Sequence, residues 1–260
     1  MIKRFSFGWQ GTTDQAETLQ KALRALMVIV IPVAISIHTV TAWLFANTLR
    51  PGWDSTNFGP YFVSGAFVAG GAFMIVLLYA VRSIFNLHNY IQPVHFNRMG
   101  MLLVLLMLVY LYFNINEYLV PAYKMRTAEK KILDVLLVGE YAGLFWFSQI
   151  GGLILPIMLL ILNSMRKPIP LAIISLVVLV AAGIKRYLIV VPTLTAPFLP
   201  AQNYPNFFRN YHPTLPEVFI TVGCIAVALL VITLLIKAFP VVPVYETAKE
   251  KGIAQAVINN

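Results

Sequence analysis

Charged residues are scarce in this chain of 260 residues, and their scarcity excludes most kinds of soluble protein. Asp, Glu, Lys and Arg make up 11% of the sequence, whereas 59% of the residues are hydrophobic. The mean hydropathy is +0.79. Because soluble domains are about a quarter charged, the composition predicts an integral membrane protein. At roughly 20 residues for each spanning helix, the chain has room for about six spans and for no sizeable soluble domain.

Cysteine is almost absent too. The single cysteine, Cys224, lies in an apolar run, whereas a disulfide needs two thiols and an iron–sulfur cluster usually needs four. Of the four histidines, only His38 falls inside a predicted span, so a haem held between two histidines is not expected. No phosphate-binding loop, dinucleotide motif, zinc-protease motif or nucleophile elbow occurs. We therefore expect no metal site, no haem and no iron–sulfur cluster in this chain.

Long apolar segments make up most of the sequence. They predict an all-α integral membrane fold, with a four-helix bundle and flanking helices in one membrane domain of residues 1–260. The predicted spans lie near residues 22–49, 60–81, 99–120, 136–162, 169–191 and 218–239. Residues 1–21 are predicted to form an interfacial segment on the cytoplasmic face, and residues 240–260 a cytoplasmic tail.

The basic residues indicate how the chain is oriented. A net charge of +9 suits nucleic acid in a soluble protein, but here the lysines and arginines lie between spans, so we expect a lipid bilayer and no nucleic acid. With both termini in the cytoplasm, 11 of these residues lie on the cytoplasmic side and 6 on the other. This bias predicts a multi-pass protein of the cell (inner) membrane with both termini cytoplasmic. Residues 121–134 are the main exception, because they place four basic residues on the outer side.

Polar and aromatic side chains surround the turn between the first two spans. His38 lies within the first span, where a polar group is costly. Its imidazole could donate a hydrogen bond to a quinone oxygen or relay a proton, or it could be a structural group bonded to its surroundings. Trp43 and Trp53 mark the boundary between membrane and water. Together with Asp54 they could shape the mouth of a pocket, although a Pro-Gly pair followed by Trp is also an ordinary interfacial turn.

Three ionisable residues fall in later spans. Glu117 lies near the end of the third span, and Lys185 and Arg186 lie near the end of the fifth. An unpaired charge in hydrocarbon is costly, so each is a functional candidate by default. An ion pair between Glu117 and Lys185 or Arg186 would bring three such groups to one depth, as a proton path needs. A static ion pair with no part in proton movement would account for the same residues.

Several motifs together resemble a known family. They are HTVTAW at residues 38–43, PGWDST at 51–56, GPYFVSGA at 59–66, the Glu117-Tyr118 pair, RYLIVV at 186–191, YHPT at 211–214 and FPVVP at 239–243. The sequence resembles the polysulfide reductase membrane subunit (NrfD/PsrC) family. It is most similar to the C-terminal part of the quinol-oxidising membrane subunit of alternative complex III.

The resemblance implies a membrane subunit with no redox centre of its own. Such a subunit binds a quinone, menaquinone or ubiquinone, and passes electrons to or from a docked iron–sulfur protein subunit. It works among other respiratory complex subunits. Because members of that branch carry further helices before the matched region, the resemblance implies that a second helical membrane chain supplies them, or that this member is naturally short.

Three functional hypotheses follow. In the first, this chain helps to form a quinone site, with His38, Trp43, Trp53 and Asp54 as candidates. In the second, it is a structural or proton-conducting subunit, with Glu117, Lys185 and Arg186 along the path. The third, an independent secondary transporter, agrees less well with the resemblance.

Overall fold

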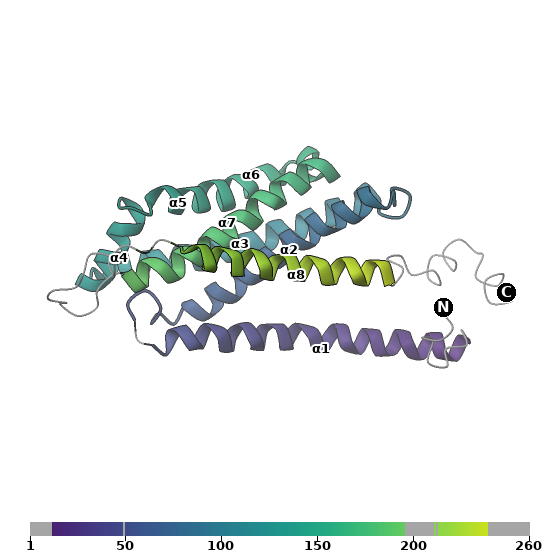
Figure 1. Cartoon of the computed structure of the whole chain (residues 1–260), viewed down its shortest axis with the longest axis horizontal. Helices are drawn as coiled ribbons and strands as arrows, with labels where there is room; N and C mark the ends of the chain where they lie inside the picture. Colours follow the sequence, from purple (N-terminus) through teal and green to yellow (C-terminus); the bar gives the residue numbers. More distant parts are fainter. Residues whose placement is uncertain (1–11, 49, 196–210, 212, 239–260) are drawn as a thin grey trace. The chain divides into compact units, whose positions relative to one another are not determined.

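The computed structural model describes residues 12–48, 50–195, 211 and 213–238 (Figure 1). All the regular structure in these residues is helical, which confirms the predicted all-α fold. The helices are α1 (Thr13–Ala46), α2 (Phe58–Ile84), α3 (Pro93–Lys124), α4 (Thr127–Leu137), α5 (Ala142–Trp146), η2 (Phe147–Ile154), α6 (Leu155–Ile161), η3 (Asn163–Arg166), α7 (Pro168–Thr195) and α8 (Leu215–Ala238). The first eleven residues of the predicted interfacial segment and the predicted tail, 240–260, lie outside the described residues.

Six helices within this part of the chain are long and apolar enough to cross a membrane. They are α1, α2, α3, the continuous helix formed by α5, η2 and α6, then α7 and α8. The prediction of about six spans is confirmed. Most of the helices run beyond the predicted spans. The first helix already begins at Thr13, within the segment predicted to be interfacial.

The chain divides into two compact units, residues 1–33 with 212–260, and residues 34–211. In the first unit, no described side chain of α8 is buried. Leucine, valine and isoleucine cover this helix, as expected for a helix that meets hydrocarbon. The prediction of a single membrane domain stays a prediction.

The second unit contains the predicted four-helix bundle. α2 packs against α3 and α7, and the helix formed by α5, η2 and α6 packs against α3 and α7. Its main core is apolar and comes from all four helices: Val68, Ala72, Ile75, Phe96, Leu103, Met107, Leu153, Ile157, Leu160, Leu171, Ile174 and Val178. Small residues allow close packing, as at Gly65, where an added Cβ would lie 3.0 Å from the Tyr110 ring.

The fourth predicted span begins too early. The prediction starts it at Leu136, but α4 ends at Leu137 and a turn containing Gly139 and Glu140 separates it from α5. The apolar residues of α4 are buried on one face, whereas Lys130 and Lys131 are exposed. α4 is therefore an amphipathic helix that does not span. In the hydropathy pattern its apolar face merges with the following span.

A wide helical turn shapes the core of the bundle. η2 is a π-helix, a form that is rare and frequent at functional sites. Pro156 follows it and removes one backbone N–H donor from the helix. Gly152 of η2 lies so close to α7 that an added Cβ would collide with Ala181. The π-helix directs Ser148 and Gln149 into the bundle, where both are buried.

Candidate functional site

A buried carboxylate lies where the first loop meets α3. Glu117 is 8% exposed, and its Oε2 accepts hydrogen bonds from Ser55 Oγ at 2.8 Å and Asn57 Nδ2 at 3.0 Å. Asn57 Nδ2 also donates to the carbonyl of Phe113 at 2.8 Å. The loop sequence Ser-Thr-Asn before α2 supplies both donors. A hydroxyl and an amide thus satisfy one oxygen of a carboxylate inside the bundle.

Lys185 is the cationic counterpart of this site. It is 5% exposed, and its Nζ donates a hydrogen bond to the Tyr118 hydroxyl at 2.8 Å. The ammonium also lies over the Tyr118 ring at 4.5 Å and the Phe145 ring at 5.1 Å from the centroids. Aromatic faces attract a desolvated cation. Tyr118 is thus the direct partner of Lys185, whereas Glu117 interacts with Lys185 only electrostatically, through space.

The ion pair considered from the sequence, between Glu117 and Lys185 or Arg186, is not formed within 4.0 Å. Among residues 12–48, 50–195 and 213–238, the ion pair within 4.0 Å is Arg126–Glu129, and neither Lys185 nor Arg186 reaches Glu117 at that distance. Arg186 Nη2 instead donates to the carbonyl of Phe62 at 3.1 Å, and its guanidinium lies 3.8 Å from the Phe62 ring centroid. An aromatic ring of α3 contacts Lys185, and an aromatic ring of α2 contacts Arg186. Neither cation therefore needs direct contact with the Glu117 carboxylate.

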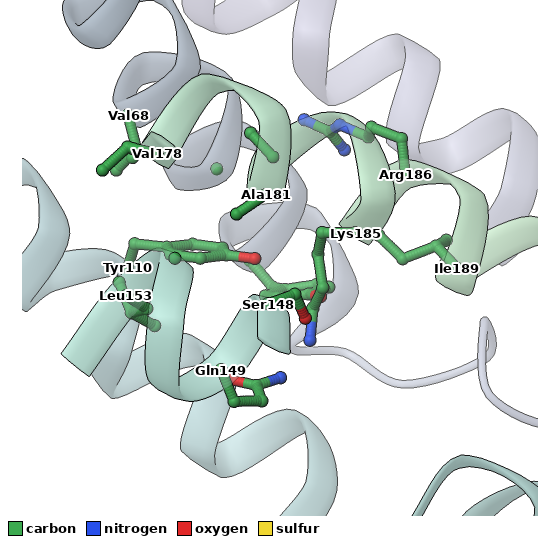
Figure 2. A pocket seen from close by; sticks show the side chains of 14 residues that line it. Val68, Tyr110, Ser148, Gln149, Leu153, Val178, Ala181, Lys185, Arg186 and Ile189 are labelled. Carbon is green, nitrogen blue, oxygen red and sulfur yellow. The ribbon is translucent and has the colours of Figure 1, made fainter. Parts of the chain in front are cut away.

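A small cavity whose lining includes several polar side chains lies inside the bundle beside Lys185 (Figure 2). Its volume is about 30 Å³, enough for two or three water molecules at about 10–15 Å³ each. Figure 2 shows Lys185 directed toward Ser148, while Arg186 extends the other way. Gln149, also in the lining, accepts a hydrogen bond of 2.6 Å from Asn114. Polar side chains of α3, η2 and α7 thus meet in the middle of an apolar bundle.

A much larger groove opens between the end of α1, the following loop, α2 and α3. Its volume is about 770 Å³, within the range of about 300–1,000 Å³ typical of ligand sites. Trp43 and Asp54, two of the four residues predicted for a quinone site, line it, as does Ser55. Phe67, Leu106 and Val109 supply apolar walls. The groove is therefore apolar along its length and polar where the loop closes it.

The other two predicted residues point elsewhere. His38 is half-buried, and its Nδ1 lies 2.8 Å from the carbonyl of Ala34 in its own helix. Its neighbours Ile35 and Thr39 line the groove, whereas His38 does not. Trp53 is buried and donates from Nε1 to the carbonyl of Ile189 at 2.8 Å. Trp53 thus anchors the loop to α7, and the role of His38 stays a prediction.

Several residues of the site were not predicted from the sequence. Ser55, Asn57 and Tyr118 bond directly to the predicted ionisable residues, and Tyr61 lines the cavity beside Lys185. Hydroxyl and amide residues are common in membrane loops and helices, so residue type alone does not single them out. The one available signal is position, because Ser55 and Asn57 directly precede a span and Tyr118 follows Glu117.

Comparison with known proteins agrees with this architecture. The family described as "Polysulphide reductase, NrfD" matches residues 7–197, most of the chain. The chain belongs to the NrfD family. This NrfD chain is also similar to a subunit of the selenate reductase of Mesobacillus selenatarsenatis, with 27% identity over 239 residues. The match covers 90% of the chain and 54% of the relative, so the chain spans about half the length of that protein.

Proposed function

We propose that this chain is a membrane subunit of a quinone-linked respiratory oxidoreductase, and that the groove beside Trp43 binds the quinone headgroup. An iron–sulfur protein subunit docked at the membrane surface exchanges the electrons. Membership of the NrfD family and similarity to a protein named as a reductase subunit support this assignment. The chain sits in the cell (inner) membrane with both termini in the cytoplasm.

The observation that carries the proposal is the position of Ser55. Its side chain lines the groove, and its hydroxyl donates a 2.8 Å hydrogen bond to Glu117. A group bound in the groove can therefore exchange a proton with a buried carboxylate through one hydroxyl. Quinone chemistry needs such a route, because oxidation of a quinol releases two electrons and two protons.

The groove residues suit a quinone, whether menaquinone or ubiquinone. An amphiphilic headgroup with an isoprenoid tail needs an aromatic or apolar wall and a few polar groups at one end. Trp43 is 57% exposed and offers a flat ring, while Asp54, Ser55 and Thr56 line the polar end. The apolar side chains of α2 and α3 provide a surface for the tail.

In this scheme the protein residues position the quinone and move protons. The quinol supplies two electrons, which pass to the iron–sulfur partner, and two protons. Ser55 passes its own proton to the Glu117 carboxylate and takes one from the quinol hydroxyl. Asn57 holds the carboxylate in place throughout, because its amide bonds to the same oxygen and to the Phe113 carbonyl. The second proton leaves to the solvent at the polar end of the groove.

The proposed complex includes a second helical membrane chain. This chain spans about half the length of its selenate reductase relative, so further helices must come from elsewhere if the assembly has the same size. α1 offers a surface for them, since apolar side chains such as Leu26, Val28 and Val30 are 60–70% exposed. Other respiratory complex subunits complete the assembly.

The test is quinol oxidation by the assembled complex with Trp43→Ala, using Leu44→Ala as the matched control. Both side chains are exposed on α1, but only Trp43 lines the groove. We expect a loss of at least about tenfold in kcat/KM for Trp43→Ala, equivalent to about 1.4 kcal/mol, and little change for Leu44→Ala. Equal rates for the two variants would refute the groove as the quinone site.

A second function is supported by the polar core, namely proton conduction without a quinone site. Lys185 bonds to Tyr118, the neighbour of Glu117 on α3, and lines a cavity large enough for water. Arg186 also lines that cavity. If the chain only conducts protons, Glu117→Gln leaves quinol oxidation intact and stops the proton movement coupled to it. If Glu117 takes the proton of the quinol, the same variant slows quinol oxidation itself.

A further inference from the structure

The amphipathic helix α4 covers a second cavity in the bundle. This cavity has a volume of about 50 Å³, enough for a few water molecules at about 10–15 Å³ each. Glu117, Tyr118 and Tyr61 of the bundle line one side, and Glu129, Ile132 and Leu136 of α4 line the other. Two carboxylates from different helices therefore face one enclosed space, and only Glu117 was expected to have a function.

The Glu129 side chain is more buried than its place on an amphipathic helix at the bundle surface requires. Its side chain is 11% exposed, and its Oε2 is buried and accepts no hydrogen bond from the residues that the structure describes. Its partner Arg126 lies 3.9 Å from Oε1 and is 66% exposed, so this ion pair is weak. An acid in the first turn of a helix is favoured by the helix dipole. The helix dipole explains why an acid is favoured at this position. It does not explain why this residue lines the cavity with a carboxylate oxygen that lacks a hydrogen-bond partner among the described residues.

Tyr61 lies between the two cavities. It lines the cavity under α4 and also the cavity beside Lys185. The side chain is 2% exposed, and its hydroxyl, which interacts with the hydroxyls of Tyr110 and Tyr118, makes no hydrogen bond of acceptable geometry within the described part of the chain. The cost of leaving a buried hydroxyl unpaired is about 1–3 kcal/mol. A water molecule or a proton carrier in either cavity would satisfy it.

We propose that the cavity under α4 is a proton-exchange site, in which Glu129 passes protons between Glu117 and the aqueous phase at the α4 end of the bundle. This inference rests on the proposed role of Glu117 and extends it. In the transfer, the protonated Glu117 gives its proton, across water in the cavity, to the Glu129 carboxylate. Glu117 returns to its ionised form, and Glu129 then releases the proton past Arg126.

The charged groups around the cavity suit a transfer in this direction. Lys185 donates a hydrogen bond to Tyr118 and interacts electrostatically with Glu117, so it stabilises that carboxylate after the proton leaves. Asp54 interacts with Glu117 from the groove side. Arg126, Lys130 and Lys131 are exposed at the outer surface of α4. Tyr118 and Tyr61 complete the titratable groups of the lining.

The experiment compares Glu129→Gln with Glu140→Gln in the assembled complex reconstituted in liposomes. Glu140 is an exposed glutamate in the turn before α5, which makes it a matched control. Proton release during single turnovers is followed with a pH dye, and quinol oxidation is followed in parallel. We expect Glu129→Gln to slow proton release at least about tenfold, and we expect Glu140→Gln to leave it unchanged. Glu129→Asp should restore most of the rate.

Infrared spectroscopy gives a second measurement on the purified full-length chain in liposomes. The carbonyl band of a buried, protonated carboxyl is recorded as pH is varied. Because the two carboxylates share a cavity, Glu129→Gln should shift the pH at which the band appears, and Glu140→Gln should not. Glu117→Gln should alter the same band.

The outcomes separate this inference from the proposed function. If Glu117→Gln impairs turnover or proton release while Glu129→Gln matches Glu140→Gln in both measurements, the role of Glu129 is overturned and that of Glu117 stands. If neither Glu117→Gln nor Glu129→Gln has an effect, both proposals fail.

Discussion

At the scale of single residues, Glu117 and Lys185 are held in a low-dielectric core by different means. Glu117 is held by two neutral donors on one oxygen, and Lys185 by one hydroxyl and two aromatic rings. Among the residues that the structure describes, neither makes a direct ion pair, although each interacts with the other through space. A direct salt bridge would fix both groups, whereas this arrangement leaves each able to gain or lose a proton without breaking an ion pair.

The first prediction concerns the partners of Glu117. Glu117→Gln keeps an oxygen acceptor for Ser55 and Asn57, so the free energy of unfolding should change by less than about 1 kcal/mol. Glu117→Leu leaves the half-buried Ser55 hydroxyl without its acceptor and leaves the Asn57 amide only its bond to the Phe113 carbonyl, so it should cost about 1–3 kcal/mol. Thermal unfolding in detergent measures both. Equal stability of the two variants would show that the bonds to Ser55 and Asn57 contribute nothing.

A second prediction concerns the bond between Lys185 and Tyr118. Tyr118→Phe leaves a buried ammonium without its acceptor and should destabilise the chain by about 3 kcal/mol. The double variant Lys185→Met with Tyr118→Phe removes both polar partners and keeps similar volumes, so its stability should return to within about 1 kcal/mol of the wild type. Simple addition of the two single-variant effects would contradict this coupling.

At the scale of elements, the sequence predicts the long apolar helices. It does not predict where a helix is interrupted by a turn or widened into a π-helix. The six spans follow from length and composition, because lipid requires a continuous helix of hydrophobic residues. α4 was missed since its apolar residues, Ile132, Leu133 and Leu136, continue into the next apolar run. The π-helix η2 gives no periodic signal in the sequence. For the candidate site, the sequence singles out the ionisable residues by their cost in hydrocarbon, but their hydrogen-bond partners depend on loop conformation.

The contact between η2 and α7 gives a prediction at this scale. An added methyl at Gly152 would collide with Ala181, whereas Gly183 on α7 has nothing within 4 Å of an added Cβ. Gly152→Ala should therefore destabilise the bundle by about 1–3 kcal/mol, and Gly183→Ala should be neutral or stabilising. Thermal unfolding of the two variants compares them. Unchanged stability for Gly152→Ala would mean that the helices separate freely at this point.

At the scale of the whole bundle, the two buried glutamates and the polar end of the groove lie toward one end. The first loop, α4 and the C-terminal end of α7 meet there, since an added Cβ at Gly52 would contact both Ile132 and Thr193. The groove, the carboxylate pair and the exposed basic residues of α4 all belong to this end. It is where electrons and protons would leave toward a docked partner. Sequence reasoning predicted the orientation of the chain but could not predict this grouping, which depends on packing.

The orientation itself can be measured with single cysteines in a Cys224→Ser background. Asn89 lies in the turn between α2 and α3, and Lys130 lies on α4; both side chains are exposed. With both termini in the cytoplasm, a membrane-impermeant thiol reagent should label Lys130→Cys from outside intact cells and Asn89→Cys only after the membrane is opened. Labelling of Asn89→Cys in intact cells would reverse the topology.

The most direct test of the quinone site is photolabelling of the assembled complex in membrane vesicles with an azide-bearing quinone, followed by mass spectrometry of the labelled peptides. The account predicts label on the groove residues, within 35–67 of α1, the first loop and α2 or within 106–113 of α3. An excess of natural quinone should displace it, and Trp43→Ala should reduce it. Label that these two treatments leave unchanged, or label found only on other subunits, would contradict the account.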